Sequence, residues 1–176
     1  TRSELMAVKS LIETVTVGAG GAASIEFTAI PQNGSDLILV ISNRVSNAQF
    51  SGNLEFNSDT AANYSHTRLF TNGAGIFTDA GATTSISFIG LGRSDFTANT
   101  FASDSIYVSN YSSGSAKSVS IEGVTENNSG AAYEYALGLA AGSYSDTNPI
   151  TSLKVYGAGS TFVQHTTASL YKIKYD

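Results

Sequence analysis

Residues 20–44, GGAASIEFTAIPQNGSDLILVISNR, contain two strand-like runs joined by a turn. In the first run, Ile25 and Phe27 alternate with polar neighbours, and this period of two predicts a strand with one buried and one solvated face. The second run, 36–42, is apolar at both sets of alternate positions, which is typical of a strand covered on both faces. Residues 31–34 between the runs favour a turn. The stretch therefore predicts a β scaffold in which 36–42 is a central strand, covered by the core and by a neighbouring layer or subunit.

The composition excludes several classes of function. Only 13% of the 176 residues are charged, the net charge is −5, and no Lys/Arg cluster occurs, so an electrostatic nucleic-acid site is not expected. The chain has no Cys, which excludes disulfides and thiolate metal sites. No apolar run approaches the length of a membrane span. We therefore expect neither a nucleic acid nor a membrane as partner.

Short strand-like runs recur along the chain between segments rich in Gly, Asn, Ser and Asp. This spacing predicts one all-β domain over residues 11–176, an antiparallel sandwich of about 8–11 strands. Residues 1–10 form a lead-in, either one helical turn capped by Ser3 or an extended arm on a neighbour. Strands are expected at 11–17, 23–29, 36–43, 53–57, 64–70, 84–91, 104–110, 116–124, 133–141, 150–156 and 169–175.

Two of these strands alternate clearly, and several loops are long. In 116–124, Val119 and Ile121 face the core, and the Ser and Glu residues between them face solvent. In 132–140, Tyr and Leu line one face and small residues line the other, which favours a second sheet or subunit packed on the small residues, or a plain exposed face. The long loops are expected to carry a binding surface or to pack between subunits; they are 43–52, 71–84, 93–102 and 157–167.

The residue types that could carry chemistry are scattered. His66 and His165 have no second His or acid at metal-ligand spacing, so we expect them to serve in surface or interface packing. Asp59 lies among Asn and Ser residues, which favours an Asx-turn over a calcium site. A glycan hydrolase with two facing acids is a remote alternative; the strand carboxylates, expected to be solvated, are Glu26, Glu55, Glu122 and Glu134. We expect no catalytic residue, no metal and no cofactor.

Four segments, in order, resemble the small β-sandwich virion proteins of tailed bacteriophages. Residues 15–44 resemble their opening G-G-A-x-x-I-x-F-x-x-I-P-x-x-x-x-D-L, and FNSDTAANYSHTRLF (56–70) resembles F-N-x-D-x-x-x-N-Y-S. SIYVSNYSSGSAKSVSIEG (105–123) resembles I-x-N-Y-x-x-x-x-x-K. ITSLKVYGAGSTFVQHTTASLYKIK (150–174) resembles the close I-T-S-L-x-L…F-x-x-G-S-x-A-S-L-Y-G-I, with Lys172 where the family often has Gly. Together the segments span most of the chain.

The resemblance implies a jelly-roll-like sandwich on a phage particle, made in the bacterial cytoplasm. We expect a capsid decoration or cement protein that binds the major capsid protein as a homo-oligomer, with a trimer as the expected state. The alternative is a tail- or head-fibre module that recognises a host-surface glycan through its long loops and exposed tyrosines, for which Tyr64, Tyr111 and Tyr144 are the candidates. The candidate partner interface consists of Arg2, Leu5, Met6, Val8, Ile76 and Phe77.

Overall fold

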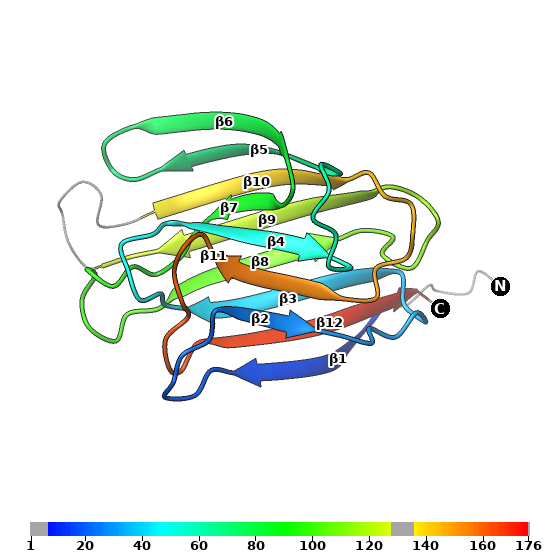
Figure 1. Cartoon of the computed structure of the whole chain (residues 1–176), viewed down its shortest axis with the longest axis horizontal. Helices are drawn as coiled ribbons and strands as arrows, with labels where there is room; N and C mark the ends of the chain where they lie inside the picture. The colour runs from blue at the N-terminus through cyan, green and yellow to red at the C-terminus, as the bar shows by residue number, and fades with distance from the viewer. Residues whose placement is uncertain (1–6, 128–135, 176) are drawn as a thin grey trace.

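The computed structural model describes residues 7–127 and 136–175 (Figure 1). The regular structure of these residues is entirely β-strand: β1 (Ala7–Thr16), β2 (Ser24–Phe27), β3 (Asp36–Asn43), β4 (Ser51–Phe56), β5 (Tyr64–Thr71), β6 (Ile76–Thr83), β7 (Ile86–Ile89), β8 (Ala102–Val108), β9 (Lys117–Thr125), β10 (Ala136–Tyr144), β11 (Leu153–Gly157) and β12 (Thr167–Tyr175). The described residues contain no helix long and apolar enough to span a membrane.

Two antiparallel sheets pack face to face, as the sequence predicts. The large sheet has the order β1-β12-β3-β8-β9-β10-β5-β6, and the small sheet has the order β2-β11-β4-β7. The hydrophobic core fills the space between them, and its largest fully buried side chains include Phe27, Phe56, Phe88 and Leu39. The all-β sandwich predicted from the spacing of strand-like runs is confirmed.

Eight of the strands follow the order of a jelly roll. When β5, β6, β9 and β10 are set aside, two four-stranded sheets remain, β1-β12-β3-β8 and β2-β11-β4-β7. The chain crosses between these two sheets at each step from β1 to β4, and again from β7 to β8, from β8 to β11 and from β11 to β12. This double-sheet arrangement of eight strands is the jelly roll.

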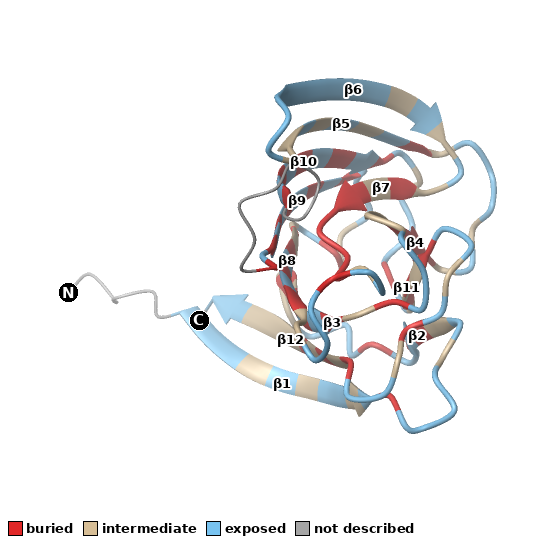
Figure 2. Ribbon diagram, turned by 90° about the vertical axis from the view of Figure 1, so that its left-hand side faces the viewer, coloured by how far each residue is buried: buried red, intermediate tan, exposed pale blue. Residues whose placement is uncertain are grey.

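The four remaining strands widen the large sheet beyond β8. β9 pairs with β8, β10 pairs with β9 and β5, and β6 pairs with β5 as the outermost strand. The β5–β6 hairpin extends past β7, which is the edge of the small sheet, so the inner face of β6 is largely exposed while that of β5 is covered in part by β7 (Figure 2). We call β9–β10 and β5–β6 the added strand pairs.

Strand β3 lies at the centre of the jelly-roll half of the large sheet, between β12 and β8. Leu37, Leu39 and Ile41 face the core and are at most 1% exposed. On the other face Val40 is 40% exposed, so no layer of the described chain covers it. The prediction of a central strand is therefore confirmed. Cover of the second face by a layer of the same chain is wrong, and cover by a neighbouring subunit stays a prediction.

Small residues let β7 approach β10 closely. A Cβ added at Gly138 would lie 2.9 Å from Cβ and 3.0 Å from the carbonyl oxygen of Ile89, and one added at Gly142 would lie 2.8 Å from Cδ1 of Ile86. Small residues of β10 therefore face the small sheet, as one reading of the sequence predicts. The leucines between them face outward.

Asp104 is a buried carboxylate between two glycines. Asn43 donates a hydrogen bond to its Oδ2, while Oδ1 has no hydrogen-bond partner among the described residues. The backbones of Gly90 and Gly123 approach this oxygen so closely that neither could carry a side chain. Burial raises the pKa of Asp104 to about 8, and the hydrogen bond from Asn43 opposes this shift. The carboxyl group therefore favours its neutral form in the folded protein.

Polar side chains close one end of the sandwich. The ammonium group of Lys117, a residue only 1% exposed, donates to the carbonyl oxygens of Ser113 (3.0 Å), Asn148 (3.2 Å) and two further residues. Asn57 accepts hydrogen bonds from the backbone N–H of Thr151 (2.8 Å) and Ser152 (3.2 Å). These contacts supply the hydrogen-bond partners that buried backbone groups require where strands end.

Several strand bounds differ from the predicted ranges by a few residues, and the largest differences are at β6 and β1. Residues 71–84 are predicted as a loop, but β6 occupies most of them. Both faces of this edge strand are largely exposed, so the alternation that identifies a strand is lost. β1 begins at Ala7, inside the predicted lead-in, because it pairs with β12 as far as Tyr175. The lead-in is predicted over 1–10; its residues 7–10 are strand and not helical turn, and residues 1–6 lie outside the described residues.

The contact between β7 and β10 predicts a stability change. Gly138→Ala should lower the free energy of unfolding by about 1–3 kcal/mol, because overpacking displaces neighbouring atoms and Ile89 contributes a backbone oxygen to the contact. Urea unfolding followed by tyrosine fluorescence measures the change. Gly114→Ala is the matched control, because a Cβ there meets nothing within 4 Å. Equal midpoints for the two variants would contradict the packing described.

The raised pKa of Asp104 predicts that the stability of the protein depends on pH. Because its pKa is about 8 in the folded protein and about 3.9 in the unfolded chain, the folded state binds the proton more tightly. The contribution of Asp104 to the free energy of unfolding is therefore fully present below about pH 4. It decreases by up to about 1.4 kcal/mol per pH unit as the pH rises to about 8. Asp104→Asn, which has a similar shape and no charge, should flatten the profile of unfolding free energy measured in urea between pH 5 and 8.

The exposed residue Asp95 provides the control for that measurement. Arg93 lowers the pKa of Asp95 by hydrogen bonding, so this carboxylate stays ionised throughout pH 5 to 8. Asp95→Asn should keep the wild-type slope. Equal slopes in Asp104→Asn and wild type over this range would show that Asp104 is ionised in the folded state.

Candidate binding surfaces

The outer face of the large sheet carries very little charge. Residue pairing across the strands aligns its outward side chains in rows; one row contains Glu122, Ser105, Val40 and Ser169. The charged residues in the described outward rows are Lys9, Asp36 and Glu122. Asp36 is buried there and accepts hydrogen bonds from two tyrosine hydroxyls. The remainder of this face consists mainly of Ser, Thr and apolar side chains.

Exposed aliphatic side chains gather on the part of this face that the added strand pairs build. Leu137 pairs with Val124, and Leu139 pairs with Leu69 in the neighbouring strand. Leu137 is 53% and Leu139 is 50% exposed. A depression of about 210 Å³ lies among these strands. We call the following residues the apolar patch: Leu69, Ile76, Val124, Leu137 and Leu139.

The structure separates the interface residues predicted from the sequence. Val8 lies on β1 and Ile76 on β6, which are opposite edges of the large sheet. Ile76 belongs to the apolar patch and is 79% exposed. Phe77 points to the other side of the hairpin, where its ring stacks on Phe70 at 5.5 Å between centroids. Arg2, Leu5 and Met6 lie outside the described residues.

Sequence reasoning missed most of the apolar patch. The signal was present in β10, where Leu137 and Leu139 alternate with small residues. Small residues fit beneath another sheet, so the leucines opposite them had to face away from the core. Large apolar residues of a strand usually face the core, whereas in β10 they face solvent and the small residues are buried. The sequence alone does not reveal which of the two faces is covered.

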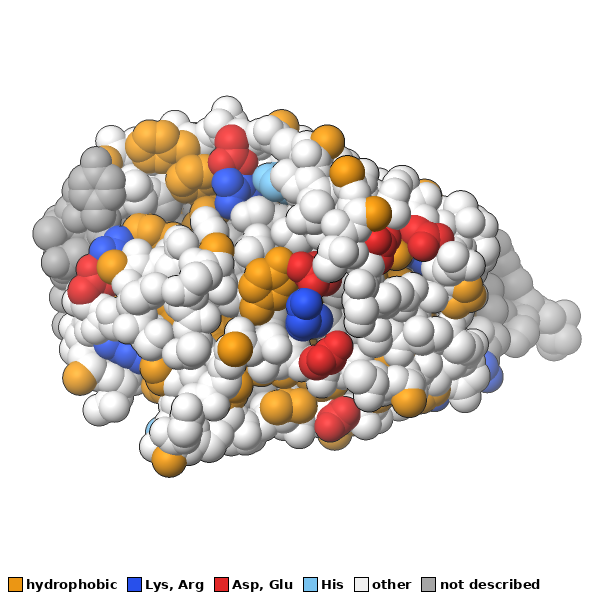
Figure 3. Space-filling model, viewed as in Figure 1, with side chains coloured by type: hydrophobic (Ala, Val, Ile, Leu, Met, Phe, Trp, Pro, Cys, Tyr) orange, Lys and Arg blue, Asp and Glu red, His pale blue; other side chains and the backbone are white. Residues whose placement is uncertain are grey.

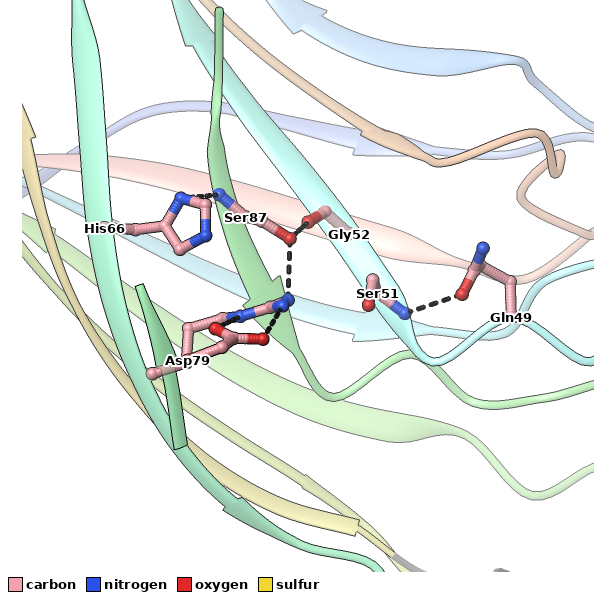
Figure 4. Close-up of polar contacts among 7 residues, drawn as sticks. Gln49, Ser51, Gly52, His66, Asp79 and Ser87 are labelled. Atoms are coloured by element: carbon pink, nitrogen blue, oxygen red, sulfur yellow. Dashed lines mark hydrogen bonds and ion pairs between the residues drawn. The ribbon is translucent and has the colours of Figure 1, made fainter. Parts of the chain in front are cut away.

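A second group of side chains lies on the inner face of the β5–β6 hairpin, beside β7 (Figure 4). Arg68 faces Asp79 across the two strands and donates two hydrogen bonds to its carboxylate, one of 2.7 Å from Nε. Nη1 of Arg68 donates to Ser87 Oγ at 2.8 Å. Nδ1 of His66 accepts a hydrogen bond from the backbone N–H of Ser87 at 3.5 Å. These contacts join the hairpin to β7 at the edge of the small sheet.

This group contains a serine, a histidine and an aspartate, but its contacts differ from those of a nucleophilic triad. In a triad the histidine accepts the proton of the serine hydroxyl and is oriented by the aspartate. Here the hydroxyl of Ser87 accepts from Arg68 and donates to the carbonyl oxygen of Gly52 at 3.4 Å. Asp79 bonds to Arg68 instead of His66. The arrangement orients the guanidinium group of Arg68.

The group has no net charge at neutral pH. Hydrogen bonds from Arg68 are the largest cause that lowers the pKa of Asp79, and the charge of Arg68 adds to it. The pKa of His66 is also lowered, first by burial and then by the nearby Arg68. At pH 7 the group therefore holds one ion pair and a neutral imidazole. On the side of the molecule that carries the small sheet, acidic and basic side chains lie next to one another amid uncharged surface (Figure 3).

Several predicted binding features instead stabilise the fold. Tyr64, Tyr111 and Tyr144 are at most 2% exposed, so the prediction that they contact a glycan from the surface is wrong. The carboxylate of Asp59 accepts from Ala61 N–H and from Asn63, which confirms the predicted loop-stabilising role. The described residues contain no group of three His, Asp or Glu side chains that could hold a metal ion.

One of the predicted binding loops and the turn that holds the second histidine are bonded to their own domain. The long loop 93–102 packs on its own domain, because Arg44 donates to four of its carbonyl oxygens, those of Ser94, Phe96, Thr97 and Thr100. His165 is exposed in a turn before β12, with a φ of 73°. Its backbone N–H donates to the carbonyl oxygen of Val17 at 3.0 Å, so this turn is joined to the end of β1.

Comparison with known proteins gives no family assignment. No protein-family model matches the chain, and no curated protein matches it. Among solved structures, an exo-inulinase from Aspergillus awamori is similar over 99% of this chain, with 11% identity and a TM-score of 0.39; the chain spans 30% of that protein. A protein of unknown function from Shewanella oneidensis MR-1 is similar over 97% of this chain and 78% of its own, with 12% identity and a TM-score of 0.29. At these TM-scores neither structure indicates a function for this chain.

Proposed function

We propose that the protein is a structural protein of a bacteriophage virion, a capsid decoration protein that binds the outer surface of the major capsid protein. The observation that supports this function best is the outer face of the large sheet, which is eight strands wide, poor in charge and carries the apolar patch. Interface cores are depleted of charged residues, and contiguous exposed apolar surface marks interaction sites. The ordered resemblance of four segments to phage virion proteins supports this class of partner.

The added strand pairs make this face larger than a jelly roll alone would provide. The apolar patch lies entirely on β5, β6, β9 and β10, the strands that widen the large sheet beyond the eight strands of the jelly roll. A decoration protein bound through it stabilises the assembled shell by mass action, because it binds the shell and not the dispersed subunit. A trimer is the proposed state, since capsid lattices offer threefold positions.

The location of the protein on the particle tests this function. Gold-labelled antibody against the purified protein, applied to purified particles of the phage that encodes it, should label the capsid shell. Particles that lack the protein should also release their genome at a lower temperature than intact particles. Label at the tail tip would show that the protein is a fibre module and not a capsid decoration protein. Particles without label would show that it is not a virion protein.

Charge placed in the apolar patch should prevent docking. Leu139→Asp should lower binding to particles that lack the protein at least tenfold in a co-sedimentation assay, because docking would bury the new carboxylate. The fold should survive, because Leu139 is half exposed and faces outward. Val8→Asp is the matched comparison at another exposed aliphatic position, on β1. If Val8→Asp abolished binding and Leu139→Asp did not, the docking surface would lie at the N-terminal strand instead.

A further inference from the structure

A hollow of about 210 Å³ lies between β5 and the edge of the small sheet. Drug-sized ligands fill roughly 300–1,000 Å³, so this space suits a smaller ligand. Strands β5, β7 and β10 and the segment that leads into β4 all contribute to it. We call it the β5 hollow, and its lining residues are Gln49, Phe50, Ser51, Arg68, Phe70, Asn72, Ile89 and Ala136.

Polar groups in the β5 hollow are held in fixed positions. The guanidinium group of Arg68 has five N–H donors; three of them bind Asp79 and Ser87. Two N–H donors therefore have no partner among residues 7–127 and 136–175. The amide of Gln49 accepts from Ser51 N–H at 3.2 Å and donates to Ala158 O at 3.1 Å, which orients it. A rigid donor set of this kind costs little entropy when a ligand binds.

The hollow also has an apolar wall. The rings of Phe50 and Phe70 form part of the wall, with Ile89 and Ala136. Arg93 lies 4.3 Å above the Phe50 ring and packs against its face, and Phe77 stacks on Phe70. Both rings of the wall are therefore held in place by a neighbour. An apolar wall beside a few oriented polar groups is the common form of a small-ligand site.

We propose that the β5 hollow binds one neutral pyranose ring of a glycan. A pyranose presents C–H groups on one side, which fit an apolar wall, and hydroxyls at its rim, which accept hydrogen bonds from planar donors such as guanidinium and amide groups. The ligand is uncharged because Asp79 already neutralises Arg68 and His66 is neutral at pH 7. An anionic ligand would have to compete with the Asp79 carboxylate for the same guanidinium.

The hollow is compatible with docking but does not depend on it. It lies on the side of the large sheet that carries the small sheet, whereas the apolar patch faces the opposite side. A protein docked through the patch would therefore leave the hollow open to solvent. Glycan binding by the isolated protein is a separate property, so either proposal can fail without the other.

Saturation-transfer NMR on the purified chain tests the site with five probes: D-glucose, D-galactose, D-mannose, L-rhamnose and N-acetyl-D-glucosamine. At least one should receive saturation from the protein, and the amide signals that shift on its addition should belong to residues around the hollow, such as Phe70 and Asn72. No saturation transfer to any of the five sugars, or shifts confined to another region, would overturn the proposal. N-acetylneuraminic acid, an anionic sugar, is tested beside the five neutral ones. If the protein bound only this sugar, the proposal that the ligand is neutral would be wrong.

Arg68→Lys is the informative variant, because lysine keeps the charge but loses the planar fork. The dissociation constant of the sugar that binds should rise at least tenfold. Leu139→Asp is the control, since it changes the apolar patch and should leave sugar affinity unchanged. Equal affinity in Arg68→Lys and wild type would contradict the role of the guanidinium. Asn72→Ala, a change at a loop residue, provides a second variant should Arg68→Lys lower stability, and a threefold or larger loss is expected.

Discussion

The buried ammonium group of Lys117 is the contact on which one end of the sandwich depends. The chain turns there between β8 and β9 and again between β10 and β11, and both turns direct carbonyl oxygens at the same nitrogen. Burial lowers the pKa of Lys117, and nearby Asp146 partly offsets this effect. A charge so deeply placed is tolerable only because several acceptors surround it. Without that charge, the carbonyl groups of two turns would be left without a common donor.

Hydrogen bonds at the same end of the molecule join the segments that resemble phage virion proteins. Asn57, from the second segment, binds the backbone at Thr151 and Ser152 in the fourth. Tyr111, from the third, donates to the carbonyl oxygen of Pro31 in the first. The residues that carry the resemblance therefore bond to one another and stabilise the jelly roll. These contacts indicate how the chain folds, whereas Arg68, Leu69 and Phe70 at the end of the second segment belong to the two candidate binding surfaces.

The sequence predicted the fold much better than the surfaces. Alternation identified strands such as β9, where every second residue is buried, because burial against the core imposes a period of two. The same reasoning failed at β6, whose exposure on both faces removes that period, and it placed Tyr64 and Tyr144 at the surface although their hydroxyls bind Phe56 and Asp59 inside the protein. The group around Arg68 could not be found either, since Asp79 and Ser87 meet Arg68 only after the hairpin folds against β7.

Three consecutive residues of β5 contribute to both candidate surfaces, the β5 hollow and the apolar patch. Successive side chains of a strand point to opposite faces, so Arg68 and Phe70 line the β5 hollow while Leu69 between them belongs to the apolar patch. In a strand inside the sandwich one of these faces would be filled by the core. Because β5 lies at the edge of the small sheet, its inner face is buried at Tyr64 but opens into the β5 hollow at Phe70. A hairpin added to a jelly roll can therefore dock on one side while it presents a binding site on the other. One short segment can thus serve two contacts without changing the buried core that holds it in place.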